Sequence, residues 1–130
     1  MRVLLIDVDY QGSLSNMLLS ADQVVEVSSP VSKLLDSGSD ATTFQSSLRK
    51  FKKVLSGSAI VPAKYELATC ENRVTIDYLL HDDKDDDGRY RLAKVLLDEE
   101  VSNTFDIALI DAPPRLTEVV PVVCAKIPLR

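Results

Sequence analysis

Three aspartates stand where apolar segments end, and their positions point to a site that handles phosphate or metal. Asp7 and Asp9 follow the aliphatic run Val3–Ile6, and Asp111 follows the run Ile107–Ile110. Carboxylates at the ends of buried strands are used to manage a metal ion, a phosphate or an attacking water. Asp7 and Asp9 are two residues apart, so they share a face if the extended backbone continues through them. Each alone could be a solvated strand end, but three at one edge favour a function.

The elements that must position these carboxylates form an α/β pattern. The runs Val3–Ile6, Ala59–Val61 and Ile107–Ile110 are short and continuous, as strands buried on both faces tend to be. Stretches with helical spacing separate them, which predicts a doubly wound, mostly parallel sheet with right-handed crossovers. In such sheets ligands bind beyond the carboxyl ends of the strands. The three aspartates fall at that edge.

Helices are predicted between the strands from their caps and apolar spacing. Ser29 and Pro30 suit the first turn of a helix over Val31–Leu35, with Gly38 as its stop. A second helix is expected where apolar residues recur at i, i+4, i+7 and i+11, and it would end at Gly57. The stripes of this helix and of two later ones are Phe44, Leu48, Phe51 and Leu55; Leu67, Cys70, Val74 and Tyr78; and Leu92, Val95 and Leu96.

Composition limits the class of protein. A chain of 130 residues fits one domain with a core, and a net charge of −5 argues against attraction of the whole protein to nucleic acid or anionic membrane. The basic run Arg49–Lys53 is expected to be the solvent face of the second helix rather than a DNA contact. Cys70 and Cys124 indicate reduced thiols. With no signal peptide or membrane span visible, a cytoplasmic protein is expected.

Three segments, taken in order, resemble the ParA/MinD family of deviant-Walker ATPases, and most closely its chromosome- and plasmid-partition branch. The segment "RVLLIDVDYQGS" (Arg2–Ser13) resembles the family's second strand and the loop after it. The segment "FDIALIDAPPRL" (Phe105–Leu116) resembles the Walker B strand and the Pro-Pro of the second switch loop. Between them, "AIVPAKYELATCENRV" (Ala59–Val74) is similar to the middle strand and following helix. The resemblance covers most of residues 2–117.

This resemblance implies a P-loop NTPase-like fold that hydrolyses ATP with Mg²⁺. Asp111 would hold Mg²⁺ through a water, and Asp9 would orient or deprotonate the attacking water. Asp7 would support the magnesium shell or the loop. The other nucleotide-binding residues that the resemblance implies are Gln11 and Gly12 in the first switch loop and Pro113 and Pro114, which would stiffen the second. Expected partners are a second copy of the chain, a ParB-like protein and, in a full-length context, non-specific DNA.

One part of the family pattern is missing from these 130 residues. The family's phosphate cradle is a glycine-rich loop that ends in Gly-Lys-Ser/Thr, upstream of the strand at Val3–Ile6. None of the four glycines here is followed by lysine. The match also fades after Thr117. We therefore expect residues 1–130 to be a single partial domain, truncated at both ends and inactive alone. Without the P-loop strand, Ile107–Ile110 is expected to have an unpaired edge or a changed partner, and the chain to self-associate.

Other functions remain open beside the ATPase. A non-catalytic remnant that persists as an interaction protein would carry the same motifs. A phosphoacceptor receiver domain would also begin with an apolar strand ending in acids, and "CAKIP" (Cys124–Pro128) mimics its Lys-Pro turn, but Asp111 comes too late for its third strand. The segment "DKDDDG" (Asp83–Gly88) fits half of a calcium loop; because Lys94 replaces the required glutamate, a solvated loop is expected.

Overall fold

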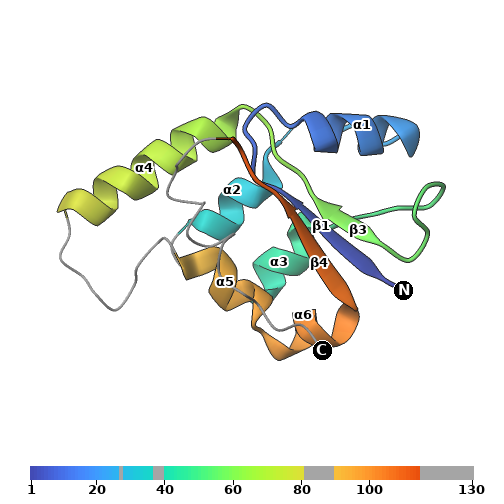
Figure 1. Cartoon of the computed structure of the whole chain (residues 1–130). Helices are drawn as coiled ribbons and strands as arrows, with labels where there is room; N and C mark the ends of the chain where they lie inside the picture. The colour runs from blue at the N-terminus through green and yellow to red at the C-terminus, as the bar shows by residue number, and fades with distance from the viewer. Residues whose placement is uncertain (27, 37–39, 81–89, 115–130) are drawn as a thin grey trace.

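The computed structural model describes residues 1–26, 28–36, 40–80 and 90–114 of the chain (Figure 1). In chain order the elements are β1 (Val3–Asp7), α1 (Ser13–Ala21), α2 (Pro30–Leu35), α3 (Ala41–Ser47), β2 (Arg49–Lys50), β3 (Ala59–Val61), α4 (Glu66–Leu80), α5 (Arg91–Leu96), α6 (Glu99–Thr104) and β4 (Ile107–Asp111). Groups of helices separate β1 from β2 and β3 from β4, in agreement with the α/β pattern that the sequence predicts.

The strands of these residues form one sheet of four, in the order β2-β3-β1-β4. β1 runs parallel to β3 and to β4, whereas β2 pairs antiparallel with β3. The register places Leu5 beside Leu109 and Asp7 beside Asp111. Because matching positions on parallel neighbours face the same side, Asp7 and Asp111 meet at the carboxyl ends. The predicted α/β fold with a mostly parallel sheet is confirmed.

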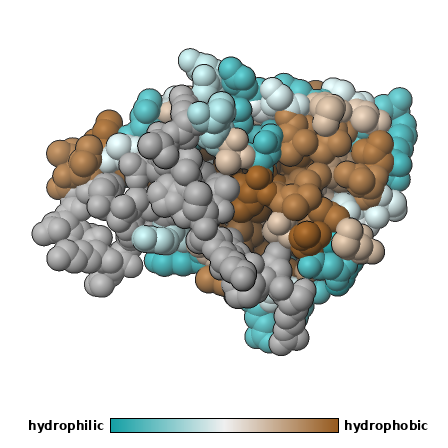
Figure 2. All heavy atoms as spheres, viewed as in Figure 1, coloured by the Kyte–Doolittle hydropathy of each residue, from teal (hydrophilic) through white to brown (hydrophobic). Residues whose placement is uncertain are grey.

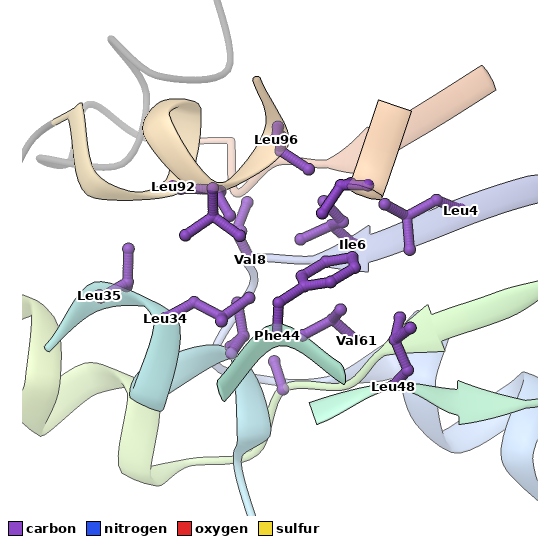
Figure 3. Close-up of a cluster of buried hydrophobic side chains, with 14 of the residues drawn as sticks. Leu4, Ile6, Val8, Leu34, Leu35, Phe44, Leu48, Val61, Leu92 and Leu96 are labelled. Carbon is purple, nitrogen blue, oxygen red and sulfur yellow. The ribbon is translucent and has the colours of Figure 1, made fainter. Parts of the chain in front are cut away.

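Helices cover both faces of the sheet, which makes it doubly wound. On one face Leu4, Ile6 and Val61 pack with apolar side chains of α2 to α6, and Phe44 of α3 lies at the centre of this cluster (Figure 3). On the other face Leu5 and Ile60 pack with Leu19 of α1 and with Phe51. The alternation of side chains along β1 therefore divides the core into two layers.

Several predicted helices are present. α2 starts at Pro30, with Ser29 at its N-cap position, as the sequence indicates. The stripes on α4 and α5 are buried at Leu67, Cys70 and Val74 and at Leu92, Val95 and Leu96. In the part of the chain that the structure describes, no helix is long and apolar enough to cross a membrane. The expectations for Gly38, for the side chain of Tyr78, for Asp83–Gly88 and for Cys124–Pro128 lie outside what the structure describes.

The predicted helix from Phe44 to Leu55 is wrong in its second half. α3 ends at Ser47, and Leu48 is extended with φ −74° and ψ 137°. Leu48 then packs on one face of the sheet and Phe51 on the other, because a strand sends alternate positions to opposite sides. Arg49 and Lys50 form the edge strand β2, so they are not the solvent face of a helix. Leu55 has φ +48° and is 51% exposed.

β4 departs from the expectation of a strand buried on both faces. Ala108 and Ile110 pack against the larger cluster, but Ile107 is 37% exposed and Leu109 is 51% exposed. β4 is also the last strand of the sheet on its side, so within the described residues its outer edge has no strand partner. The expectation for Ile107–Ile110, an unpaired edge or a changed partner, stays a prediction.

Candidate functional site

The site begins where β1 and β4 end together. Asp7 is fully buried, whereas Asp111 on the neighbouring strand is exposed. The backbone N–H of Val8 donates to the carbonyl oxygen of Asp111 at 3.0 Å, so the two chains stay side by side past their last paired residues. This contact brings the loop after β1, which contains Asp9, to the same edge of the sheet as Asp111.

Asp7 is held by three hydrogen bonds. One carboxylate oxygen accepts from the backbone N–H of Asp9 at 3.0 Å. The other accepts from the backbone N–H of Ser15 at 3.0 Å and from its hydroxyl at 2.6 Å. Burial raises the pKa of Asp7 and the Asp111 carboxylate raises it further, while these hydrogen bonds oppose the rise. Asp7 therefore serves as an internal anchor for the loop and for α1.

Ser15 extends this anchor to a third element. Its hydroxyl oxygen accepts from the backbone N–H of Ala63 at 3.0 Å while the hydroxyl donates to Asp7. The chain of hydrogen bonds thus joins β1, the first turn of α1 and the segment that follows β3. Ser15 is itself buried. The sequence pattern did not single out Ser15, whose local signal is only a small polar side chain next to apolar residues of α1.

Asp9 and Gly12 shape the loop between β1 and α1. A carboxylate oxygen of Asp9 accepts from the backbone N–H of Gln11 at 3.0 Å, and its carbonyl accepts from Gly12 at 2.8 Å. Gly12 has φ +63°, and a Cβ there would lie 2.5 Å from the carbonyl oxygen of Ala63. Glycine is therefore required at this close approach. The Asp9 side chain is half-buried, and Gln11 is exposed.

Two further contacts at this edge were not predicted. The ammonium of Lys64, just after β3, donates to the side-chain oxygen of Asn16 on α1 at 2.8 Å. The rings of Tyr10 and Tyr65 meet edge to face, with centroids 5.9 Å apart. Lys64 places a cation at the edge that otherwise carries the three aspartates. These contacts join residues about 50 positions apart, so local spacing gives no sign of them.

The second predicted loop starts directly after Asp111. Ala112 is partly buried against the larger core cluster, Pro113 is buried and Pro114 is exposed. The structure therefore brings Asp7, Asp9 and Asp111 to one edge with Gln11 and Gly12, and Pro113 and Pro114 leave from that edge. The roles expected of these seven residues stay predictions.

The protein side chains at this edge could supply only part of the ligand shell of a Mg²⁺ ion. Asp111 offers a hard, exposed oxygen ligand, which suits Mg²⁺. Asp7 uses both of its oxygens in hydrogen bonds inside the fold. In the part of the chain that the structure describes, no group of three or more His, Cys, Asp or Glu side chains could hold a metal ion. Mg²⁺ here would need phosphate oxygens and water as further ligands.

A family model described as an AAA domain matches residues 1–124. The chain belongs to this family. Together with its structural neighbours, the match makes the chain a member of the ParA/MinD-like P-loop ATPases, so the resemblance seen in the sequence is confirmed. No match was found among curated proteins.

Solved structures agree with the family match. Cobyrinic acid a,c-diamide synthase from Mycobacterium smegmatis, with bound ATP analogue and magnesium, is 27% identical, with a TM-score of 0.64 over 94% of this chain and 43% of that chain. A partition protein is 22% identical, with a TM-score of 0.70 over 95% and 33%. Apo McdA from Cyanothece is 19% identical, with a TM-score of 0.65 over 94% and 41%. The last two show the fold alone. The chain spans less than half the length of each of these proteins.

Proposed function

We propose that this chain is the part of a ParA-like partition ATPase that carries the first switch loop, the Walker B strand and the start of the second switch loop. The observation that supports this most is the meeting of Asp7, Asp9 and Asp111 at the carboxyl ends of β1 and β4. The cobyrinic acid a,c-diamide synthase neighbour was crystallised with an ATP analogue and magnesium, which supports Mg²⁺-ATP as the ligand of the family site.

In this proposal the three aspartates have different tasks. Asp7 stays buried and positions the loop through the backbone N–H of Asp9 and through Ser15. Asp9 orients the attacking water, because its carboxylate is only half-buried and the bond from Gln11 fixes its direction. Asp111 is the exposed carboxylate that would hold Mg²⁺. When bound, the ion would neutralise charge that develops on the transferred phosphoryl group.

The phosphate cradle is proposed to come from a glycine-rich loop outside these 130 residues. None of the four glycines is followed by lysine, and Gly12 points its open side at the carbonyl of Ala63 rather than at a ligand. The three carboxylates at the edge repel a triphosphate unless a cation lies between them. The chain alone is therefore proposed to hydrolyse no ATP.

The test uses a protein in which a glycine-rich loop of the family precedes residue 1. Asp9→Ala is expected to abolish ATP hydrolysis and to leave ATP binding largely intact, because a water-orienting group acts mainly in the transition state. Asp111→Ala is expected to weaken Mg²⁺-dependent binding as well. Glu99→Ala, an exposed carboxylate in the first turn of α6, is the matched control and should change neither. Hydrolysis at the parent rate by Asp9→Ala would refute the assignment.

A second function, that of a non-catalytic interaction module, is favoured by the exposed edge and face of β4. The ATPase is proposed to associate with a second copy of itself and with a ParB-like partner and, in a longer protein, to bind non-specific DNA. Its proposed location is the cytoplasm. Mg²⁺-ATP titration of the completed protein separates the two functions, since the interaction module would bind no nucleotide. Membership of the ATPase family argues against the receiver-domain alternative.

A further inference from the structure

Three lysines of the basic run lie in and just after the edge strand β2, in a connection that we call the lysine loop (residues 50–57). Lys50 ends β2, Lys52 and Lys53 follow it, and all three side chains are exposed. The backbone N–H of Phe51 donates to the carbonyl oxygen of Ser58 at 3.0 Å and closes the loop. The loop projects from the end of the sheet where β1 and β3 begin (Figure 1). A ligand bound there would leave the carboxylate edge accessible.

The carboxylates next to the lysine loop are occupied by other partners. Glu26 is paired with Arg49. Asp22 is only 4% exposed and accepts from backbone N–H groups of the loop. Among the described residues, no ion pair joins a carboxylate to any of the three ammonium groups, and that of Lys53 donates to the neutral side-chain oxygen of Gln23. The loop therefore concentrates positive charge, although the whole chain has a net charge of −5.

Two exposed aliphatic side chains accompany the three lysines. Leu55 of the lysine loop is 51% exposed and has φ +48°, a backbone conformation that residues with a Cβ rarely adopt. Val25 is 89% exposed, in the segment that follows α1. This segment adjoins the loop, since Val24 and Val54 pack against the same core cluster and Asp22 accepts from the backbone N–H of Val54. Figure 2 shows hydrophilic residues along the end of the molecule where α1 ends, so apolar side chains there have polar surroundings.

We propose that the lysine loop and the segment around Val25 bind the surface of a membrane that contains anionic phospholipids. Near such a surface each lysine strengthens binding by about fivefold, because its ammonium is attracted to the charged headgroups. The side chains of Leu55 and Val25 enter the boundary between headgroups and acyl chains, which removes their apolar surface from water. This binding does not depend on ATP or on the proposed hydrolysis.

The shape and chemistry of the lysine loop favour a membrane over other anionic partners. A projecting loop suits a broad, flat surface, whereas a peptide is usually bound in a groove or along a sheet edge. Proteins that bind single-stranded nucleic acid stack bases on aromatic side chains, and the exposed apolar residues here are aliphatic. The phosphates of a duplex would attract the lysines but leave Leu55 and Val25 in water.

Co-sedimentation of the 130-residue chain with vesicles tests the role of charge. At low ionic strength the chain is expected to bind vesicles of phosphatidylcholine mixed with phosphatidylglycerol, to bind phosphatidylcholine alone at least about tenfold more weakly, and to be released by salt. Lys52→Ala should lower the affinity about fivefold. Lys94→Ala, which removes an exposed cation on α5, is the matched control and should leave the affinity unchanged. Equal losses in the two variants would overturn the proposal.

Leu55→Gly tests the role of the apolar side chain. Because glycine adopts a positive φ readily, this variant should fold like the parent and still bind the anionic vesicles about fivefold or more weakly. Leu97→Gly, at a 57% exposed position after α5, is the matched control and should bind like the parent. Unchanged affinity of Leu55→Gly, or no binding of the parent to anionic vesicles, overturns the proposal. Tighter binding of the parent to duplex DNA in the same buffer would indicate nucleic acid instead and also overturns it. If Leu55→Gly fails to fold, the comparison of Lys52→Ala with Lys94→Ala decides.

Discussion

At the residue scale, the site depends on one buried carboxylate. Asp7 accepts hydrogen bonds from Asp9 and from Ser15, and Ser15 in turn accepts from Ala63. This network ties the Asp7 carboxylate to the loop after β1, to the start of α1 and, through Ser15, to the segment that follows β3. Asp9 and Asp111 are more exposed than this anchor, which is consistent with the proposal that they carry the chemistry and that Asp7 positions the loop.

The raised pKa of Asp7 gives a pH-dependent prediction. A carboxyl whose folded pKa lies above its ordinary value of 3.8 binds its proton more tightly when folded, so its contribution to stability falls as pH rises through the window above 3.8. Asp7→Ala leaves three donors without their acceptor and should cost about 1–3 kcal/mol. Urea unfolding should show a larger cost near pH 4.5 than near pH 7.5. A cost that grows with pH would contradict this account.

Gly12 gives a second residue-scale prediction. Gly12→Ala places a Cβ 2.5 Å from the carbonyl of Ala63 at a positive φ and should lower the free energy of unfolding by about 2–3 kcal/mol. Gly57→Ala is the matched control. Gly57 also has a positive φ, +84°, but the nearest atom to its Cβ is 3.9 Å away, so it should lose only about 1 kcal/mol. Equal losses in thermal unfolding would show that the contact with Ala63 is unimportant.

At the scale of elements, local sequence patterns predicted the strands and helices whose own apolar residues form one buried run or face. The continuous runs of β1, β3 and β4 and the caps and spacing of α2, α4 and α5 carry enough information for their assignment. The segment after Phe44 does not, because its apolar positions fit a helix as well as a strand that crosses between two core layers. The burial of Leu48 and Phe51 on opposite faces decides between them, and this depends on the rest of the sheet.

Asp22 shows how the strand alternative is held in place. Its carboxylate, at the end of α1, accepts from the backbone N–H groups of Lys52, Lys53 and Val54. The hydrogen bond from Lys52 contributes most to lowering the pKa of Asp22 below its ordinary value of 3.8. The ionised Asp22 carboxylate therefore stabilises the fold above pH 3.8, and this stabilisation is lost as the pH falls below that value. A helix continuing from α3 would have used these donors itself.

Asp22→Ala is therefore expected to release this segment locally. Hydrogen exchange of the Lys52, Lys53 and Val54 amides should speed up by about tenfold or more, while the amides of β1 and β3 keep their protection. Asp40→Ala is the matched control, because Asp40 caps α3 through the backbone N–H of Thr43. It should affect α3 and leave the three amides unchanged. Unchanged exchange in Asp22→Ala would contradict the role given to this carboxylate.

At the scale of the whole molecule, the sequence predicted the edge of the sheet where the carboxylates meet, but not which of them would be buried. The pattern of buried strands and helices predicted a parallel sheet with Asp7, Asp9 and Asp111 at the carboxyl ends of its strands, and the parallel register of β1 and β4 brings Asp7 and Asp111 side by side. Buried Asp7 is held by Ser15, and Ser15 accepts from the backbone N–H of Ala63, which lies 48 residues farther along the chain, so no local pattern shows this contact. The chain covers at most 43% of the length of each solved protein described above. The phosphate cradle is proposed to come from outside it.

We propose that the carboxylate edge acts with a phosphate cradle that these 130 residues do not supply. Titration calorimetry with ATP and Mg²⁺ tests this, on the chain alone and on a protein with a family glycine-rich loop placed before residue 1. We expect little or no binding by the chain alone, and Mg²⁺-dependent binding by the completed protein that Asp111→Ala weakens. Micromolar ATP affinity of the chain alone, or no binding by the folded, completed protein, would contradict it.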